Sequence, residues 1–390
     1  MLPKTLSNGI CSLNEEEDRR TLSCFVTLDK KGKIISCDIK KSLIKSKVRG
    51  VYSEVNDILD KGEGSEYYDK YSCLFPDTLP TALELYKILA KKSSLRGAME
   101  LETTESIIHL DETGYPDSIT KRERGISERL IEQFMLCANE AVANWLFDMS
   151  MPCVYRIHEK PDAEKIHSFA LFAHNSGLDA GVLAAKNIHP SMLSRILRQA
   201  KEKGIGATVS NVLLRCLSKA KYSPEASLHF GLCIDKYCHF TSPIRRYPDL
   251  ATHRIISNIL SGNISEVSAN YLYSFAARAA EKSSENEIRA MNAERDIENM
   301  YKCLYLYQYI GKEFEAIVCS VTSFGFFAEL ENTCEGLVPI GSLEGEYIFD
   351  EGSYSLLCGS KRITLGQRVR VTVEDVNVTE RKITFSACDF

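Results

Sequence analysis

The sequence predicts an α+β protein that ends in an all-β barrel. Three observations carry this prediction. Residues 21–42 alternate apolar and polar side chains as strands do, most of the stretch from 126 to 309 repeats apolar residues at helical spacing, and short β segments broken by glycines follow Gly311. The change near residue 310 is the clearest boundary in the chain. We therefore expect a first domain over 1–309 and a barrel domain over 310–390.

The bulk composition excludes several classes of protein. The 390 residues carry a net charge of -5, so nucleic-acid binding does not follow from overall charge, and any phosphate ligand needs local clusters of Lys and Arg. None of the 14 cysteines forms a CxxC pair, which excludes zinc-ribbon spacing. No apolar run approaches the roughly 20 residues of a membrane helix. We expect a cytoplasmic protein without a membrane segment.

The N-terminal third is predicted to hold two hairpins and a short helix. Leu22, Cys24 and Val26 alternate ahead of a turn at Lys30-Lys31-Gly32, which indicates a hairpin over 21–42. A short helix then ends at Gly62. A second strand pair over 105–120 turns at Gly114.

Helices are predicted through the middle of the chain. An apolar stripe with a 3.6-residue period covers 126–149 and includes Ile131, Phe134, Val142, Trp145 and Leu146. Further helices fit 162–175, 189–203, 206–220 and 243–261, and a long one runs from about 265 to 309.

Two adjacent arginines stand out in "HFTSPIRRYPDLATHR", residues 239–254. Thr241 or Ser242 is suited to cap a helix whose first position is Pro243, which places Arg245 and Arg246 in the first turn. A cation there opposes the helix dipole, whereas a bound phosphate would satisfy both arginines and the free N–H groups. The alternative is an ion pair with Asp249 across one turn.

The same stretch resembles the signature of the ribonuclease II/ribonuclease R family, which are processive 3′-to-5′ exoribonucleases. Further blocks resemble the family in the family's order: "SKVRGVYSEVNDIL", "LIEQFMLCANEAVANWL", "PCVYRIHEKPD", "HFGL" and "NAERDI". The last 80 or so residues resemble the OB-fold RNA-binding domain that follows the catalytic domain in this family. The resemblance implies the C-terminal portion of an RNB catalytic domain followed by an OB-fold barrel, a single-stranded RNA substrate and a monomer.

The resemblance also implies roles for four residues of the catalytic domain. Arg245 matches an arginine at the scissile phosphate, Arg246 a backbone-phosphate contact, and Glu294 a glutamate that supports catalysis. Tyr52 matches a tyrosine that packs against the last nucleotides. From the residues alone, the favoured interpretation of Tyr52 is a core aromatic, and that of Glu294 is one of several solvated helix carboxylates.

Four more residues are implied to contact RNA. Arg156 and His158 lie in "PCVYRIHEKPD", and Phe324 and Phe327 in "VTSFGFFAEL" match the barrel's RNA-facing aromatics. Aromatic rings are suited to this task because stacking on a base tolerates any sequence. Phe326 is expected to fill the barrel interior instead.

The resemblance implies a Mg²⁺ cofactor. The aspartate block that holds this ion in the family, of the type D-x-R-D-[FI]-D-D, does not occur in this sequence. We therefore expect a fragment of the family's longer chain, truncated at its N-terminus, with the metal ligands on a missing segment or on another chain. The predicted function is hydrolysis of RNA to nucleoside 5′-monophosphates, with little activity from this chain alone. A non-catalytic RNA-binding protein or split-gene subunit on the same scaffold is the alternative.

Overall fold

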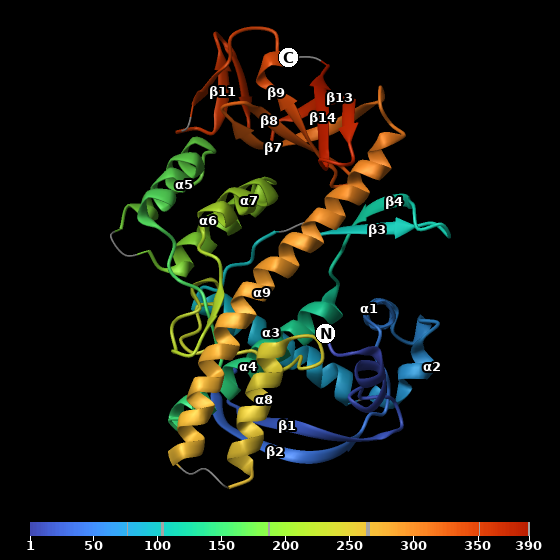
Figure 1. Cartoon of the computed structure of the whole chain (residues 1–390), viewed down its shortest axis with the longest axis vertical. Helices are drawn as coiled ribbons and strands as arrows, with labels where there is room; N and C mark the ends of the chain where they lie inside the picture. Colours follow the sequence, from blue (N-terminus) through green and yellow to red (C-terminus); the bar gives the residue numbers. More distant parts are fainter. Residues whose placement is uncertain (76, 103–104, 186–187, 263–265, 351, 389–390) are drawn as a thin grey trace. The chain divides into compact units, whose positions relative to one another are not determined.

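The computed structural model describes all residues except 76, 103–104, 186–187, 263–265, 351 and 389–390 (Figure 1). The chain forms two compact units. Unit 1 consists of residues 1–98, 124–159 and 219–287, and unit 2 of residues 99–123, 160–218 and 288–390. Each unit is made of three separate stretches of the chain. The domain limits predicted above, 1–309 and 310–390, divide the chain at one point, and they stay a prediction. No helix among the described residues is long and apolar enough to cross a membrane.

Unit 1 is built on a long antiparallel hairpin covered by helices. Strands β1 (Asp18–Leu28) and β2 (Ile34–Lys45) pair with Cys24 opposite Ile39. Ile39 is 1% exposed and joins a core made mainly by α4 (Ile126–Asp148), α8 (Tyr247–Leu260) and the first part of α9 (Glu266–Tyr307). The hairpin and the helix α4 confirm the sequence prediction. Val142 and Leu146 of the predicted stripe are fully buried, whereas Ile131 is exposed.

The remaining elements of unit 1 are short, apart from one long helix. They are α1 (Tyr52–Lys61), α2 (Tyr68–Tyr71), α3 (Thr78–Arg96), β5 (Tyr155–Ile157) and β6 (Lys221–Ser223), with short turns at Leu6–Ile10, Gly62–Gly64, Ser72–Leu74 and Phe230–Leu232. Helix α1 ends at Gly62 as predicted, where φ is 57° and glycine is favoured. The 19-residue helix α3 was not predicted.

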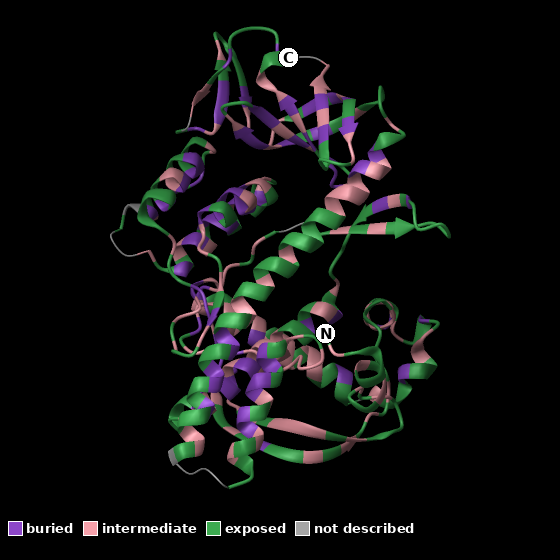
Figure 2. Ribbon diagram, in the orientation of Figure 1, coloured by how far each residue is buried: buried purple, intermediate pink, exposed green. Residues whose placement is uncertain are grey.

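Unit 2 contains the barrel. Five strands close in the order β13-β14-β9-β8-β7, which are Arg368–Asn377, Lys382–Ala387, Glu335–Pro339, Gly325–Leu330 and Glu313–Thr322. A three-stranded sheet accompanies it: β10 (Ile348–Asp350), β11 (Ser355–Cys358) and β12 (Lys361–Thr364). Phe326 and Phe385 are fully buried inside, and Figure 2 shows buried residues recurring along the barrel strands. The predicted OB-type barrel is therefore present.

The second part of α9, three further helices and a second hairpin complete the described part of unit 2. The helices are α5 (Ala163–Asn175), α6 (Pro190–Glu202) and α7 (Gly206–Cys216), the hairpin is β3 (Ser106–Leu110) with β4 (Pro116–Lys121), and short turns occur at Gly181–Ala184 and Ile340–Ser342. These elements match the predicted ranges closely, although α7 ends at Cys216 rather than at 220. The predicted start of the long helix, at about 265, lies outside the described residues.

Candidate nucleic-acid interface

The double arginine lies ahead of α8, and not inside its first turn. Residues 243–245 form a tight turn in which the Arg246 N–H donates to the Ser242 carbonyl at 3.0 Å, and the helix begins at Tyr247. The predicted start at Pro243 is therefore wrong, because Pro248 takes the early helical position. Arg246 is the N-cap residue, with extended backbone angles of -124° and 122°.

Arg246 is held by the carboxylate of Asp249. Its Nε and one terminal nitrogen donate to the two Asp249 oxygens at 2.8 and 2.9 Å, and the Ser242 N–H donates to the same carboxylate at 2.7 Å. Asp249 is fully buried, whereas the Arg246 side chain is 23% exposed. Such a two-pronged pair in a buried setting fixes both side chains. The ion-pair alternative is thus the geometry found for Arg246.

Arg245 has no such partner. Its side chain is exposed and makes no hydrogen bond or ion pair with any described residue. The turn that carries it is anchored on both sides through Asp249, by Ser242 and by Arg246. The charge of Arg246 is therefore balanced by Asp249, whereas the guanidinium of Arg245 is free to bind a ligand. A guanidinium in that state is a ready donor to an oxyanion.

A third arginine belongs to the same unit. Arg156 lies on β5 directly opposite Tyr222 on β6, with its guanidinium 4.6 Å from the centre of the Tyr222 ring. One terminal nitrogen donates to Glu287 of α9 at 2.6 Å, and the arginine side chain is 15% exposed. Ring stacking and an ion pair therefore fix Arg156 in place.

Tyr222 connects Arg156 to His239, the first residue of the arginine signature. The Tyr222 hydroxyl and His239 Nδ1 are 2.9 Å apart, and the His239 ring stands edge-on to Tyr237 at 5.6 Å. The Asn139 side-chain NH₂ donates to the Tyr237 hydroxyl at 2.9 Å, and its carbonyl oxygen accepts from the Phe240 N–H at 3.0 Å. This network ties the start of the signature to α4. Sequence reasoning missed it because its members are up to 101 residues apart in the chain.

The network keeps its histidines neutral. Burial, and then the positive charges of Arg246, Arg156 and others including Arg245, lower the pKa of His239 to about 2. Burial lowers the pKa of His229 to about 3, with help from the charges of His158 and Arg156. The arginines are therefore close enough to His239 to act on it electrostatically. Arg246 and Arg156 are balanced by Asp249 and Glu287, so Arg245 leaves an unbalanced positive charge here that an anion would relieve.

The other predicted residues of the catalytic domain lie in varied surroundings. His158 is 7% exposed and its Nδ1 accepts from the Gly231 N–H at 3.0 Å, so its ring is packed in the core. Tyr52 begins α1 with 45% exposure. Glu294 is an exposed residue of α9 with no hydrogen bond or ion pair to a described residue, and it belongs to unit 2. The proposed RNA contacts of these three stay predictions.

The barrel aromatics are split between a turn and a strand. Phe324 lies between β7 and β8 and is 54% exposed, whereas Phe327 lies on β8 and is half-buried. Their rings meet edge to face at 6.2 Å and 90°. Two residues three apart on one strand would point to opposite sides of the sheet. The turn allows them to meet, and Phe326 fills the interior as predicted.

The residues do not fit the magnesium ion that the family resemblance implies. No group of three or more His, Cys, Asp or Glu side chains within the described ranges is placed to hold a metal ion. Mg²⁺ needs near-octahedral oxygen ligands, usually including carboxylates. The described residues therefore do not supply a magnesium site of their own.

Comparison with known proteins agrees with the fold and the signature. Residues 1–262 match the RNB domain and residues 307–387 match the S1 RNA binding domain. The first match alone covers more than half of the chain. The protein therefore belongs to the family of RNB-domain proteins.

Its relatives include ribonucleases R. The chain is 40% identical over 380 residues to ribonuclease R 1 of Lactococcus lactis, and 37% identical over 366 residues to ribonuclease R of Thermotoga maritima. The matches cover 96% and 93% of this chain but 46% and 51% of those proteins, so the chain spans about half the length of its curated relatives. Mycoplasma genitalium RNase R in complex with ribose-methylated single-stranded RNA has a TM-score of 0.90 at 27% identity, over 99% of this chain and 60% of that one.

Proposed function

We propose that this chain is the RNA-holding part of a 3′-to-5′ exoribonuclease that releases nucleoside 5′-monophosphates. The observation that carries the proposal is the free Arg245 beside an arginine whose charge is already paired. Membership of the RNB family and the relatives named ribonuclease R support it.

Each part of the chain would have its own task in the reaction. Arg245 would bind the scissile phosphate and stabilise the charge that develops on its oxygens. Phe324 and Phe327 would stack on bases, and the exposed ring of Tyr52 would pack against the last nucleotides. Arg156, which is paired with Glu287 through one terminal nitrogen, would bond RNA through the rest of its guanidinium. Single-stranded RNA is the proposed partner, bound by a monomer in the cytoplasm.

The carboxylates that hold the metal ion would come from outside this chain. Magnesium would supply charge neutralisation and an activated water, but it would need carboxylates that the described residues do not group together. We propose that the segment carrying those carboxylates lies outside this chain, either upstream or on a second polypeptide. The same observation favours a second candidate function, an RNA-binding subunit without nuclease activity.

One experiment separates these possibilities. The purified chain is mixed with 5′-labelled single-stranded RNA and Mg²⁺, and binding and shortening are followed in the same samples. We expect binding without shortening. Processive shortening by a preparation free of contaminating nuclease would contradict the proposed division of the site, and failure to bind would contradict the proposed function itself.

A further inference from the structure

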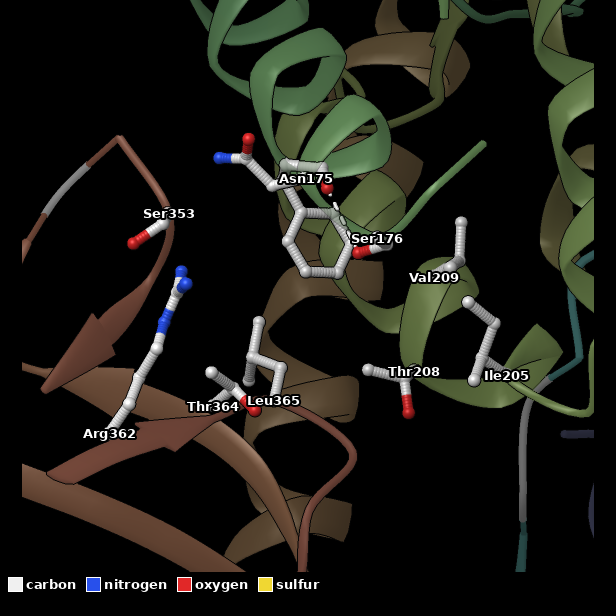
Figure 3. A pocket seen from close by; sticks show the side chains of 10 residues that line it. Asn175, Ser176, Ile205, Thr208, Val209, Ser353, Arg362, Thr364 and Leu365 are labelled. Carbon is white, nitrogen blue, oxygen red and sulfur yellow. Dashed lines mark hydrogen bonds between the residues drawn. The ribbon is translucent and has the colours of Figure 1, made fainter. Parts of the chain in front are cut away.

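A cavity of about 260 Å³ lies within unit 2, away from the double arginine in the sequence (Figure 3). One wall comes from α5, α7 and the residues beside them, and the other from the strands that accompany the barrel. This volume lies just below the roughly 300 Å³ at which pockets for drug-sized ligands begin. The cavity is partly open to solvent, so a small ligand can enter it and extend beyond its rim.

The two walls are joined by direct contacts. The rings of Phe172 on α5 and Tyr354 meet edge to face at 6.1 Å and 89°. Arg215 on α7 donates to the Ser320 hydroxyl of β7 at 2.7 Å. The cavity is therefore formed before any ligand arrives, and a ligand in it would touch both walls.

The lining contains one charged side chain. Arg362 of β12 is exposed and makes no hydrogen bond or ion pair with the part of the chain that the structure describes. None of the lining residues that the structure describes is acidic, although the lining hydroxyl of Ser353 donates to the carboxylate of Asp350. The cavity therefore favours an anion, because a free guanidinium gains most from an oxyanion.

The rest of the lining divides into polar and apolar parts. Asn175 and Thr208 have side chains with no hydrogen bond to a described residue, so they can bond a ligand. In Figure 3 the Arg362 guanidinium and the Asn175 amide lie on one side of the view, while Ile205 and Val209 lie on the other. One cation beside an apolar surface suits one phosphate attached to one apolar group, rather than a polyanionic strand.

We propose that this cavity binds a phosphomonoester of nucleotide size, with Arg362 on the phosphate. Asn175 and Thr208 would bond the polar middle of the ligand, and the half-buried Ile205 and Leu365 would contact its flat apolar part. The site is separate from the proposed RNA contacts, and it does not depend on RNA hydrolysis. A ligand that touches both walls would also stabilise unit 2 against unfolding.

The test is equilibrium binding of adenosine 5′-monophosphate to the full chain, by calorimetry without RNA or metal. Adenosine and inorganic phosphate are measured as separate ligands. We expect measurable binding of the nucleotide below 1 mM ligand, on the order of small-ligand affinities, and weaker binding of either part alone. Arg362→Gln should weaken nucleotide binding at least about tenfold, the loss expected for a charged hydrogen bond. Arg289→Gln, an exposed arginine on α9 outside the lining, is the matched control and should leave it unchanged.

Three results would overturn the proposal. They are no binding of the nucleotide, equal binding by parent and Arg362→Gln, and adenosine or phosphate binding as tightly as the nucleotide. Arg362 has no partner to lose, so its variant should fold, and its melting temperature checks this. Whether the chain binds or shortens RNA has no influence on these outcomes.

Discussion

Replacing Asp249 by alanine should destabilise unit 1 more than any other single change in the arginine signature. The carboxylate accepts from Arg246 twice and from the Ser242 N–H once, and it is fully buried. Removing one partner of a buried ion pair costs about 3–5 kcal/mol. Arg246 is 23% exposed, so water recovers part of that loss. The Ser242 N–H would lose its acceptor, which adds about 1 kcal/mol or more, and the expected total is about 3 kcal/mol.

The assay is urea unfolding followed by fluorescence. Trp145 is the chain's single tryptophan and packs against the core of unit 1, which also contains Ala251 and Ile255 of α8. Its signal therefore reports on that unit, which matters because a chain with two units need not unfold in one step. Asp249→Asn serves as a control that keeps an acceptor for the Ser242 N–H and should lose less. A loss below about 1 kcal/mol for Asp249→Ala, small for a buried pair, would refute the view that this carboxylate organises the signature.

Three further outcomes are expected. Phe324→Ala with Phe327→Ala should weaken single-stranded RNA binding by about 2 kcal/mol, at roughly 1–3 per stacked base, while the barrel stays folded by circular dichroism; unchanged affinity would exclude stacking. In an enzyme whose metal ligands have been restored, Arg245→Ala should lower kcat by about 10² to 10³, and Arg245→Lys should not restore it fully; a change within twofold would exclude a role at the scissile phosphate. The depressed pKa values of His229 and His239 mean that the unfolded chain binds more protons below its ordinary histidine pKa of about 6.5. Stability should thus fall by about 1–2 kcal/mol per histidine between pH 7 and pH 5, and a stability that rises over this range in urea titrations would contradict the neutral buried state.

Local patterns predicted most of the fold. The hairpin of β1 and β2, the stripe of α4 and the barrel all follow from the spacing of apolar residues, because each such pattern matches the period of one element. The start of α8 was missed, since Pro243 and Pro248 are both suited to an early helical position and only the bond from Ser242 to Asp249 selects the second.

The candidate site was predicted less completely. The signature pointed to both arginines, but their different roles depend on how Asp249 is buried, and burial is a property of the packed unit. The link from Arg156 through Tyr222 to His239 joins residues 156, 222 and 239, and no local pattern indicates such a contact. Side chains that meet across the fold in this way are found only from the structure.

The central claim is that Arg245, and not its paired neighbour, is available to RNA phosphate. The most direct test is the salt dependence of single-stranded RNA binding by the parent chain and by Arg245→Ala, measured by fluorescence anisotropy. Loss of one phosphate contact should reduce the slope of log K against log salt by about 0.7, with unfolding of unit 1 by urea unchanged. An unaltered slope for Arg245→Ala, in a variant that binds RNA and folds as the parent does, would contradict the claim.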